Sequence, residues 1–308
     1  MTEVNVKSEC AFGCPTKECI SGDIIEMIAE KVLNDDRSAN NKPDNKPDNK
    51  PNNTSDNKPN NTPNQPIETG GIKDHPATLL AKVEQVFQCD SESCLLAHPE
   101  VIKLVGEDTI EREKKKLKPY GPKDHKWFNN FNIDSVLEQF QRIDEYKFFH
   151  YPFAMMDFAS YGHPLMKKPP AVIYDEGKRC YGCVINTDKI SGPGKHWMAL
   201  FGDMRDDHTW TVEFFNSSGN PYSEVTKYLV FAEQNMKQYI ADKGLDVQTQ
   251  IIPVLSIEHQ KSNTECGPYS LYYIWSRLTG VTPQEIDSKR IPDSTVTKFR
   301  DFIFRDYE

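Results

Sequence analysis

The sequence has no long apolar run. Hydrophobic residues make up 37% of its 308 residues, and no segment approaches the roughly 18 consecutive apolar side chains of a membrane-spanning helix. The first ten residues, MTEVNVKSEC, also lack the apolar stretch of a secretory signal, which favours an intracellular location. In a reducing compartment, the 8 cysteines are expected to be free thiols.

The sequence also has fewer basic than acidic residues, 37 Lys and Arg against 46 Asp and Glu. The formal net charge of -9 argues against a general binder of nucleic acid or of a membrane surface, because phosphate-rich partners select for a basic face. The chain also contains no P-loop, no HExxH and no GxSxG motif. We therefore expect neither a bound cofactor nor a metal.

One segment has almost no apolar side chains. Residues 41–66 read NKPDNKPDNKPNNTSDNKPNNTPNQP, a degenerate repeat that cannot bury enough surface to fold. Helical patterns lie on either side, at residues 23–33, 76–87 and 98–117, the last as one helix or two. Pro119, Gly121 and Pro122 then mark a boundary. We expect a helical N-terminal arm at 1–120, interrupted by a flexible spacer at 41–71, and a second domain at 121–308.

The chain beyond this boundary mixes strand and helix patterns. A capped helix is expected near Asp134 (IDSVLEQF), with further helices at 222–240, after Cys266 and at 295–304. Short strands are expected at 171–174, 182–186, 197–201, 210–215 and 251–255. This mixture indicates an α+β or α/β domain around one central sheet.

Cys266 stands where a polar loop meets a run of large apolar side chains, in SNTECGPYSLYYIW. A helix that begins there would hold Pro268 in its first turn, where the missing N–H costs nothing. The thiol would then lie at the positive end of the helix dipole, which favours the reactive thiolate. A free cysteine is also often just a small buried residue, and this stretch alone leaves both interpretations open.

His196 and Asn216 occupy matching positions around a predicted hairpin. If its turn is centred near residue 206, the two side chains lie opposite one another on one face, whereas a shift of one residue would separate them. The imidazole would then take the proton of a cysteine nucleophile, and the Asn216 amide oxygen would orient the ring. Asp203 is the alternative orienting residue.

Gln260 lies six residues before Cys266, in the loop that leads to the same helix. Its side-chain amide, together with the backbone N–H of Cys266, would hold the oxyanion of a tetrahedral intermediate. The pair Cys180 and Cys183 has the spacing of half a zinc site or of a redox pair, but no second CxxC or histidine pair completes a zinc site.

The order His196, Asn216, Gln260 and Cys266, with Trp197 directly after the histidine, resembles that of the ubiquitin-like-protein proteases. This clan includes the SUMO proteases and the adenovirus maturation protease. Within it, the chain is most similar to the polyprotein-processing proteases of asfarviruses, in segments such as CDSESC, NFNID, GKHW, FFNSSGN and HQKSNTECGPYSLYYI. The resemblance implies an α+β fold, with a SUMO-protease-like core around a central mixed sheet flanked by helices and a mainly helical N-terminal arm. The repeat at 41–66 departs from the family pattern.

The resemblance also implies a function. Cleavage after Gly-Gly in Gly-Gly-Xaa sites of viral structural polyproteins is expected during virion maturation, in the host cytoplasm and the virion, with core-shell proteins as partners. By position, Cys266 is the nucleophile, His196 the base, Asn216 the orienting residue and Gln260 the oxyanion donor, and Trp197 is expected to contact substrate. The alternatives are an isopeptidase that removes ubiquitin-like modifiers from host proteins, and an inactive protease-derived scaffold.

A possible substrate lies in the chain itself. Gly70 and Gly71 precede Ile72, directly after the repeat, and this sequence fits the implied specificity. The sequence therefore raises the hypothesis of self-cleavage after Gly71.

Overall fold

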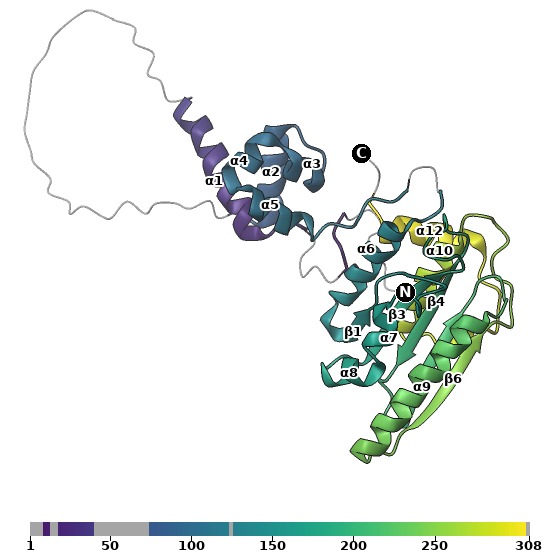
Figure 1. Cartoon of the computed structure of the whole chain (residues 1–308). Coiled ribbons are helices and arrows are strands. Elements are labelled where there is room, and N and C mark those ends of the chain that lie inside the picture. Colours follow the sequence, from purple (N-terminus) through teal and green to yellow (C-terminus); the bar gives the residue numbers. More distant parts are fainter. Residues whose placement is uncertain (1–8, 13–17, 40–73, 123–125, 306–308) are drawn as a thin grey trace, which may run out of the picture. The chain divides into compact units, whose positions relative to one another are not determined.

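The computed structural model describes residues 9–12, 18–39, 74–122 and 126–305. The chain separates into a smaller unit, Glu18–Lys115, and a larger unit that comprises residues 1–17 and 116–308 (Figure 1). Within the described ranges, every helix is too short or too polar to cross a membrane. The functional division into an arm and a catalytic core near residue 120 stays a prediction, and the proposed spacer lies outside the described residues.

The described part of the smaller unit is helical. Its elements are α1 (Gly22–Ala39), α2 (Pro76–Phe87), α3 (Glu92–Ala97), α4 (Pro99–Val105) and α5 (Glu107–Lys114). Apolar side chains of α1, α2 and α3 are fully buried, among them Ile28, Val83 and Leu95. The predicted helices at 23–33 and 76–87 are confirmed. The pattern at 98–117 forms two helices, because Gly106 takes a backbone φ of 86° between them.

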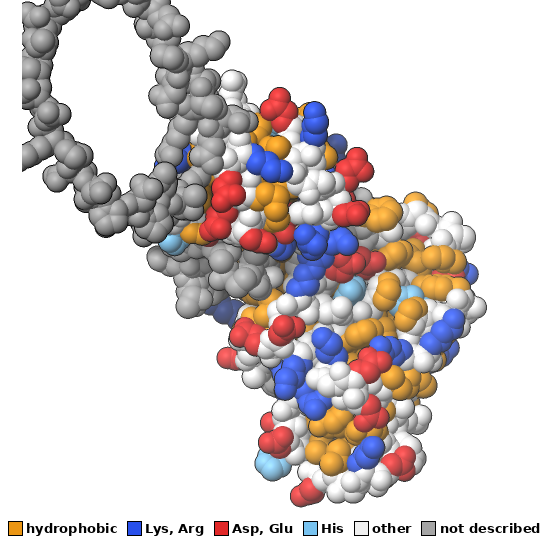
Figure 2. Space-filling view, turned by 90° about the vertical axis from the view of Figure 1, so that its left-hand side faces the viewer, with side chains coloured by type: hydrophobic (Ala, Val, Ile, Leu, Met, Phe, Trp, Pro, Cys, Tyr) orange, Lys and Arg blue, Asp and Glu red, His pale blue; other side chains and the backbone are white. Residues whose placement is uncertain are grey.

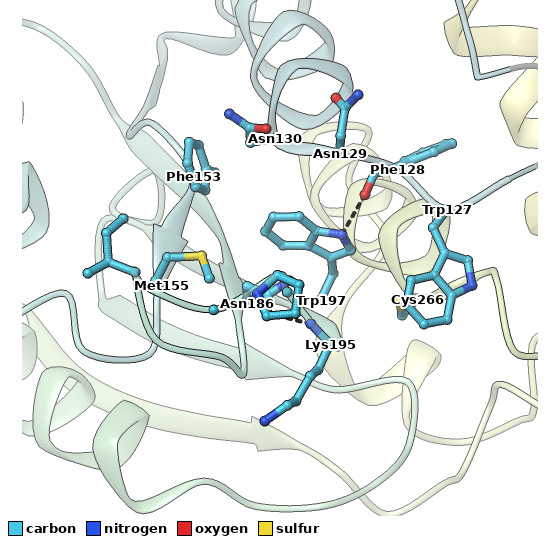
Figure 3. A pocket seen from close by; sticks show the side chains of 14 residues that line it. Trp127, Phe128, Asn129, Asn130, Phe153, Met155, Asn186, Lys195, Trp197 and Cys266 are labelled. Carbon is cyan, nitrogen blue, oxygen red and sulfur yellow. Dashed lines mark hydrogen bonds between the residues drawn. The ribbon is translucent and has the colours of Figure 1, made fainter.

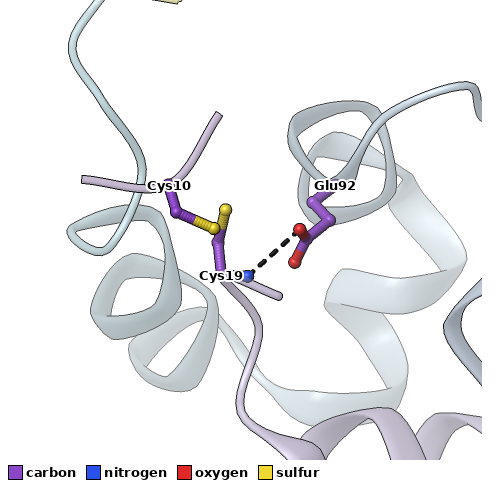
Figure 4. A group of neighbouring side chains, drawn as sticks. All are labelled: Cys10, Cys19 and Glu92. Carbon is purple, nitrogen blue, oxygen red and sulfur yellow. Dashed lines mark hydrogen bonds between the residues drawn. The ribbon is translucent and has the colours of Figure 1, made fainter. Parts of the chain in front are cut away.

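Two carboxylates fix the chain just before α1. Glu92 of α3 accepts hydrogen bonds from the backbone N–H groups of Cys19 (3.1 Å) and Ile20 (2.7 Å) (Figure 4). The buried carboxylate of Glu113 accepts from the Ser21 N–H at 2.8 Å. These contacts satisfy backbone donors that precede the first turn, so the start of α1 is tied to α3 and α5.

The prediction that all cysteines are free thiols is wrong for Cys89 and Cys94. These residues form a disulfide, with their Cα atoms 5.5 Å apart. The turn between α2 and α3 brings them within disulfide geometry, which an argument from compartment alone could not foresee. In the described part of the chain, Cys180, Cys183 and Cys266 are free.

A six-stranded mixed sheet forms the centre of the larger unit. Its strands are β1 (Phe148–His150), β2 (Ala154–Met155), β3 (Cys180–Asn186), β4 (Trp197–Asp203), β5 (Thr209–Phe215) and β6 (Gln248–Val254). The order is β1-β3-β4-β5-β6, and β2 pairs with the far end of β3. The pairs β3–β4 and β4–β5 are antiparallel, while β1 and β6 run parallel to their neighbours. The expected α+β fold with a central mixed sheet is confirmed.

Helices cover both faces of this sheet (Figure 1). One face carries α6 (Asn130–Gln141), α10 (Cys266–Leu278) and α12 (Asp293–Ile303). The other carries α7 (Pro164–Lys167), α8 (Pro170–Asp175) and α9 (Ser223–Lys243). The short η2 (Asp144–Tyr146) and α11 (Pro283–Ile286) lie in connections. Cys180 belongs to the first core and Cys183 to the second. Since they point to opposite faces of β3, the two thiols cannot share a metal ion.

Most of the expected elements of the larger unit are present. The strands expected at 182–186, 197–201, 210–215 and 251–255 correspond to β3, β4, β5 and β6, and the helices at 222–240 and 295–304 to α9 and α12. The strand expected at 171–174 is wrong, because Pro170 begins the helix α8 there. The helix expected near Asp134 begins at Asn130, where Asn129 and Asn132 form a capping box.

Candidate active site

Cys266 is the first residue of α10, as the sequence predicts, and Pro268 lies in the first turn. The helix is buried along most of its length and packs against β4 in the core. Cys266 itself is only 4% exposed. The thiol is therefore held at a fixed point, at the end of a rigid central helix.

Burial changes the electrostatic expectation for this thiol. Burial is the largest influence and raises the pKa of Cys266 above its usual value, and the charge of Glu265 also raises it. Hydrogen bonding from the backbone N–H groups of Trp197, Gly267 and Cys266 acts in the opposite direction but is weaker. The backbone N–H groups at the helix N-terminus thus favour the thiolate as the sequence predicts, but burial outweighs them and the pKa of the thiol is raised.

His196 and Asn216 meet at the ends of two neighbouring strands. His196 directly precedes β4, Asn216 directly follows β5, and the His196 Nε2 lies 2.7 Å from the Asn216 Oδ1. The predicted contact is confirmed, but the predicted hairpin centre is wrong by one residue, which changes the pairing register by two. Phe215 pairs with Ala199, which centres the hairpin on residue 207. The two side chains are diagonal neighbours on one face, which still allows contact.

The hydrogen bonds of Asn216 define the state of the histidine ring. The Asn216 Nδ2 donates to the Asn220 carbonyl at 2.8 Å, so its Oδ1 must face His196. An amide oxygen only accepts, and Nε2 therefore carries the ring proton. This leaves Nδ1 unprotonated and able to act as a base. Burial lowers the pKa of His196 below its usual value, and the hydrogen bond to Asn216 offsets this effect only in part.

Ser218 and Asn220 are site residues that the sequence argument missed. Besides the Asn220 contact, the Ser218 N–H and hydroxyl donate to the Asn216 Oδ1 at 3.1 and 3.0 Å. Together these bonds hold the orienting amide in one position. The signal in the sequence was the polar run NSSGN directly after a buried strand, a composition typical of side chains that bond to nearby backbone.

Gln260 lies beside the same turn. Ser217 Oγ donates to the Gln260 Oε1 at 2.8 Å, and the backbone N–H of Gln260 donates to the Ser217 carbonyl at 3.0 Å. The Gln260 Nε2 donates to the Ser262 carbonyl at 2.8 Å, which uses one of its two N–H groups. The other remains for an oxyanion. The role of oxyanion donor stays a prediction.

A cavity of about 390 Å³ leads to the thiol of Cys266 (Figure 3). Its walls combine aromatic residues, a glycine-rich loop and a few amides; they include Trp127, Phe128, Phe153, Asn186, Gly194 and Trp197. The indole N–H of Trp197 donates to the Phe128 carbonyl at 2.9 Å, which fixes the ring. The predicted contact of Trp197 with substrate stays a prediction, and its position in the cavity wall is compatible with it.

The structure brings His196, Asn216 and Gln260 into one region and excludes one alternative. Asp203 pairs with Arg205 and Arg277, at 2.6 and 2.9 Å, and is thus not the partner of His196. No hydrogen bond joins the Cys266 thiol to the His196 ring among the described residues, although the thiol contacts the backbone of the next residue, Trp197. Gly70 and Gly71 lie outside the described residues.

Residues 183–308 match the model of the Ulp1 protease family, C-terminal catalytic domain. A cysteine protease of African swine fever virus, from a Malawi tick isolate, is 38% identical over 246 residues, which cover 74% of this chain and 87% of the relative. A relative from a South African tick isolate of the same virus, called a SUMO-1 cysteine protease, is 37% identical over the same shares.

Solved structures give the same result. A crystal structure of the African swine fever virus protease is 33% identical, covers 78% of this chain and 95% of its own, and superimposes with a TM-score of 0.61. A second crystal structure of that protease covers 97% of this chain, at 30% identity and a TM-score of 0.65. This chain is therefore a cysteine protease of the Ulp1 family and belongs with the African swine fever virus protease within it.

Proposed function

We propose that the protein is an endopeptidase that cleaves after Gly-Gly in Gly-Gly-Xaa sites of viral structural polyproteins during virion maturation. In this proposal, Cys266 is the nucleophile, His196 the base, Asn216 the orienting residue and Gln260 an oxyanion donor. The similarity to proteases of African swine fever virus supports a viral role.

The observation that carries the specificity is the burial of the thiol at the end of an aromatic-walled cavity. Cys266 is 4% exposed, and the rings of Phe128 and Trp197 stand in the wall beside it. A substrate main chain must approach this thiol between fixed aromatic side chains. Residues without a β-carbon next to the scissile bond make that approach without a steric clash. Two consecutive glycines therefore fit the geometry.

The proposed reaction begins with proton transfer from the Cys266 thiol to the unprotonated Nδ1 of His196. The thiolate attacks the carbonyl carbon of the second glycine, and the oxyanion accepts hydrogen bonds from the Cys266 N–H and the free N–H of Gln260. The imidazolium then donates its proton to the leaving amine. The amine departs, and the glycine carbonyl stays bound to Cys266 as a thioester. Water, deprotonated by His196, hydrolyses the thioester and restores the thiol.

The proposal places the protein in the host cytoplasm and the virion, with polyproteins and core-shell proteins as partners. On the face of the molecule seen in Figure 2, acidic and basic side chains are interspersed rather than gathered by sign. Such a surface, with a net charge of -9, supports protein partners over nucleic acid, which selects for one basic face.

Two matched peptides test the specificity. One carries Gly-Gly-Xaa and the other Gly-Ala-Xaa with the same flanks. We expect the added methyl group to lower kcat/KM by about tenfold or more, because it would stand next to the scissile bond, beside the aromatic walls of the cavity. Cys266→Ala and His196→Ala should abolish cleavage. Equal cleavage of both peptides would contradict the proposed specificity.

The isopeptidase alternative is favoured by one observation, the description of a relative as a SUMO-1 cysteine protease. SUMO and ubiquitin conjugates of a lysine-containing peptide, assayed beside the Gly-Gly-Xaa peptide, separate the two functions. Release of the modifier with a higher kcat/KM than the linear peptide would favour the isopeptidase. No cleavage of any substrate, with no alkylation of Cys266, would favour an inactive scaffold.

A further inference from the structure

A buried ion pair lies directly behind the nucleophile. Glu265 immediately precedes Cys266, and its carboxylate accepts a 2.8 Å hydrogen bond from the Nε of Arg300 on α12. The two side chains are 7% and 5% exposed. A buried ion pair stabilises a fold no better than packed apolar residues do. Its position next to the thiol therefore points to a role in the active site.

Arg300 joins three parts of the site through its guanidinium group. Besides Glu265, it donates from Nη2 to the Thr264 carbonyl at 3.1 Å and from Nη1 to the Lys126 carbonyl at 2.9 Å. The guanidinium also lies 4.6 Å from the centre of the Phe128 ring. One side chain thus ties α12 both to the loop before the nucleophile and to the segment that forms a wall of the cavity.

Phe128 completes the connection to the nucleophile. A β-carbon at Gly267 would lie 2.9 Å from the Phe128 ring, so the ring packs directly on the residue after Cys266. The Phe128 carbonyl also receives the Trp197 indole N–H. A displacement of Arg300 would therefore shift the thiol in two ways, through the loop before Cys266 and through the Phe128 ring of the cavity wall.

The pair also determines the charge beside the thiol. Two charged groups lie near Cys266 among the described residues: Glu265 on its own element acts on the thiol, and Lys195 before β4 lines the same cavity. The Glu265 charge raises the pKa of the thiol, and the Arg300 guanidinium, an opposite charge, contacts that carboxylate from α12 at 2.8 Å.

We propose that Arg300 and Glu265 are positioning residues for the nucleophile: the pair holds the Thr264–Cys266 loop against the cavity wall and keeps the carboxylate beside the thiol neutralised. This inference rests on the assignment of Cys266 as the nucleophile. Neither residue touches the reacting atoms, and both act through Cys266.

The test is the pH dependence of Cys266 alkylation by iodoacetamide in Arg300→Gln, Glu265→Gln and the double variant. Peptide mapping by mass spectrometry separates Cys266 from Cys180 and Cys183. With Arg300→Gln, we expect alkylation near pH 7 to slow by about threefold or more and the profile to move to higher pH. Glu265→Gln should move it to lower pH, and the double variant should return it toward wild type.

Arg300→Lys separates charge from position. Lysine keeps the positive charge but lacks the planar fork that reaches the Thr264 and Lys126 carbonyls. We expect this variant to keep the wild-type pH profile of alkylation, while kcat/KM for a Gly-Gly-Xaa peptide falls about tenfold.

Arg277→Gln is the matched control. Arg277 lies on the same helix as Cys266, 11 residues beyond it, and its ion pair with Glu213 of β5 is also buried. This variant should lower thermal stability and leave the alkylation profile unchanged. If the profiles of Arg300→Gln and Glu265→Gln superimpose on wild type, the pair is only structural and the inference is overturned. If Arg300→Gln does not fold, Glu265→Gln decides alone. Peptide cleavage by Cys266→Ala would instead refute the proposed function.

Discussion

The buried ion pair between α10 and β5 allows a quantitative test of how the nucleophile helix is held. Glu213 is fully buried, and its carboxylate accepts hydrogen bonds from the Arg277 Nε (2.7 Å) and Nη2 (2.9 Å) and from the Tyr273 hydroxyl (2.6 Å). Asn216 follows β5 directly, and Cys266 begins α10. The pair therefore fixes the helix of the nucleophile to the strand that leads to the orienting residue.

Arg277→Met removes the cation and leaves the Glu213 charge with hydroxyl donors only. Asp203, which also contacts Arg277, keeps Arg205 at 2.6 Å, so only one charge loses its partner. Removal of one member of a buried pair costs about 3–5 kcal/mol. For a domain of this size, each kcal/mol corresponds to roughly 2–4 °C in Tm, and we expect Tm to fall by about 6–20 °C.

The measurement is urea denaturation, followed by tryptophan fluorescence, together with thermal unfolding. The midpoint should fall while the m-value stays constant, since the surface exposed on unfolding is unchanged. Glu213→Gln combined with Arg277→Met removes both charges and should recover most of the loss. A Tm of Arg277→Met within about 2 °C of wild type, or no recovery in the double variant, would refute the reasoning, since Tm follows the energy of the pair.

Three further predictions concern the acid groups and the site. Burial raises the pKa of Asp134 from 3.8 to about 6, so the protonated carboxyl group contributes stability that is complete below pH 3.8 and lost as pH rises through 6. In urea titrations, Asp134→Asn should therefore be as stable as wild type near pH 4. Above pH 6 it should be more stable, by about 1–2 kcal/mol after allowance for partial exposure. The amide oxygen of the new asparagine can still accept the Phe153 N–H. A loss of stability at pH 7 would therefore contradict the raised pKa of Asp134. Asn216→Ala frees the His196 ring and should lower kcat/KM for a Gly-Gly-Xaa peptide by about 10–100-fold, and unchanged kinetics would exclude the orienting role. Self-cleavage after Gly71 predicts that active protein loses residues 1–71 in intact-mass spectra while Cys266→Ala does not; identical masses would end that hypothesis.

The predictable part of the fold was the part with a local signal. β3 and β4 are largely apolar, β5 and β6 carry apolar residues at their carboxyl ends, and α2 carries proline in its first turn. β1 and β2 span three and two residues, too short for any periodicity, and their parallel partners lie elsewhere in the chain. The segment at Ala171 failed because Val172 and Ile173 favour a strand locally, while the preceding prolines and burial of Ile173 favour a helix.

The site shows the same division between local and long-range signals. The contact between His196 and Asn216 followed from counting residues across a hairpin, and it tolerated an error of one residue in the centre because diagonal neighbours share a face. The cavity wall at Trp127 and Phe128 could not be inferred, because nothing local connects it to α10. Only the folded chain brings the Phe128 ring against Gly267.

The state of the thiol shows why a local argument about reactivity was incomplete. A helix N-terminus and three backbone N–H groups favour the thiolate of Cys266, yet burial outweighs them. The pKa of His196 is lowered by burial too, so burial disfavours the charged forms of both groups. Proton transfer from the Cys266 thiol to the His196 ring is then expected only when bound substrate supplies the carbonyl carbon that the thiolate attacks. We therefore expect Cys266 to become more reactive when a peptide substrate fills the cavity.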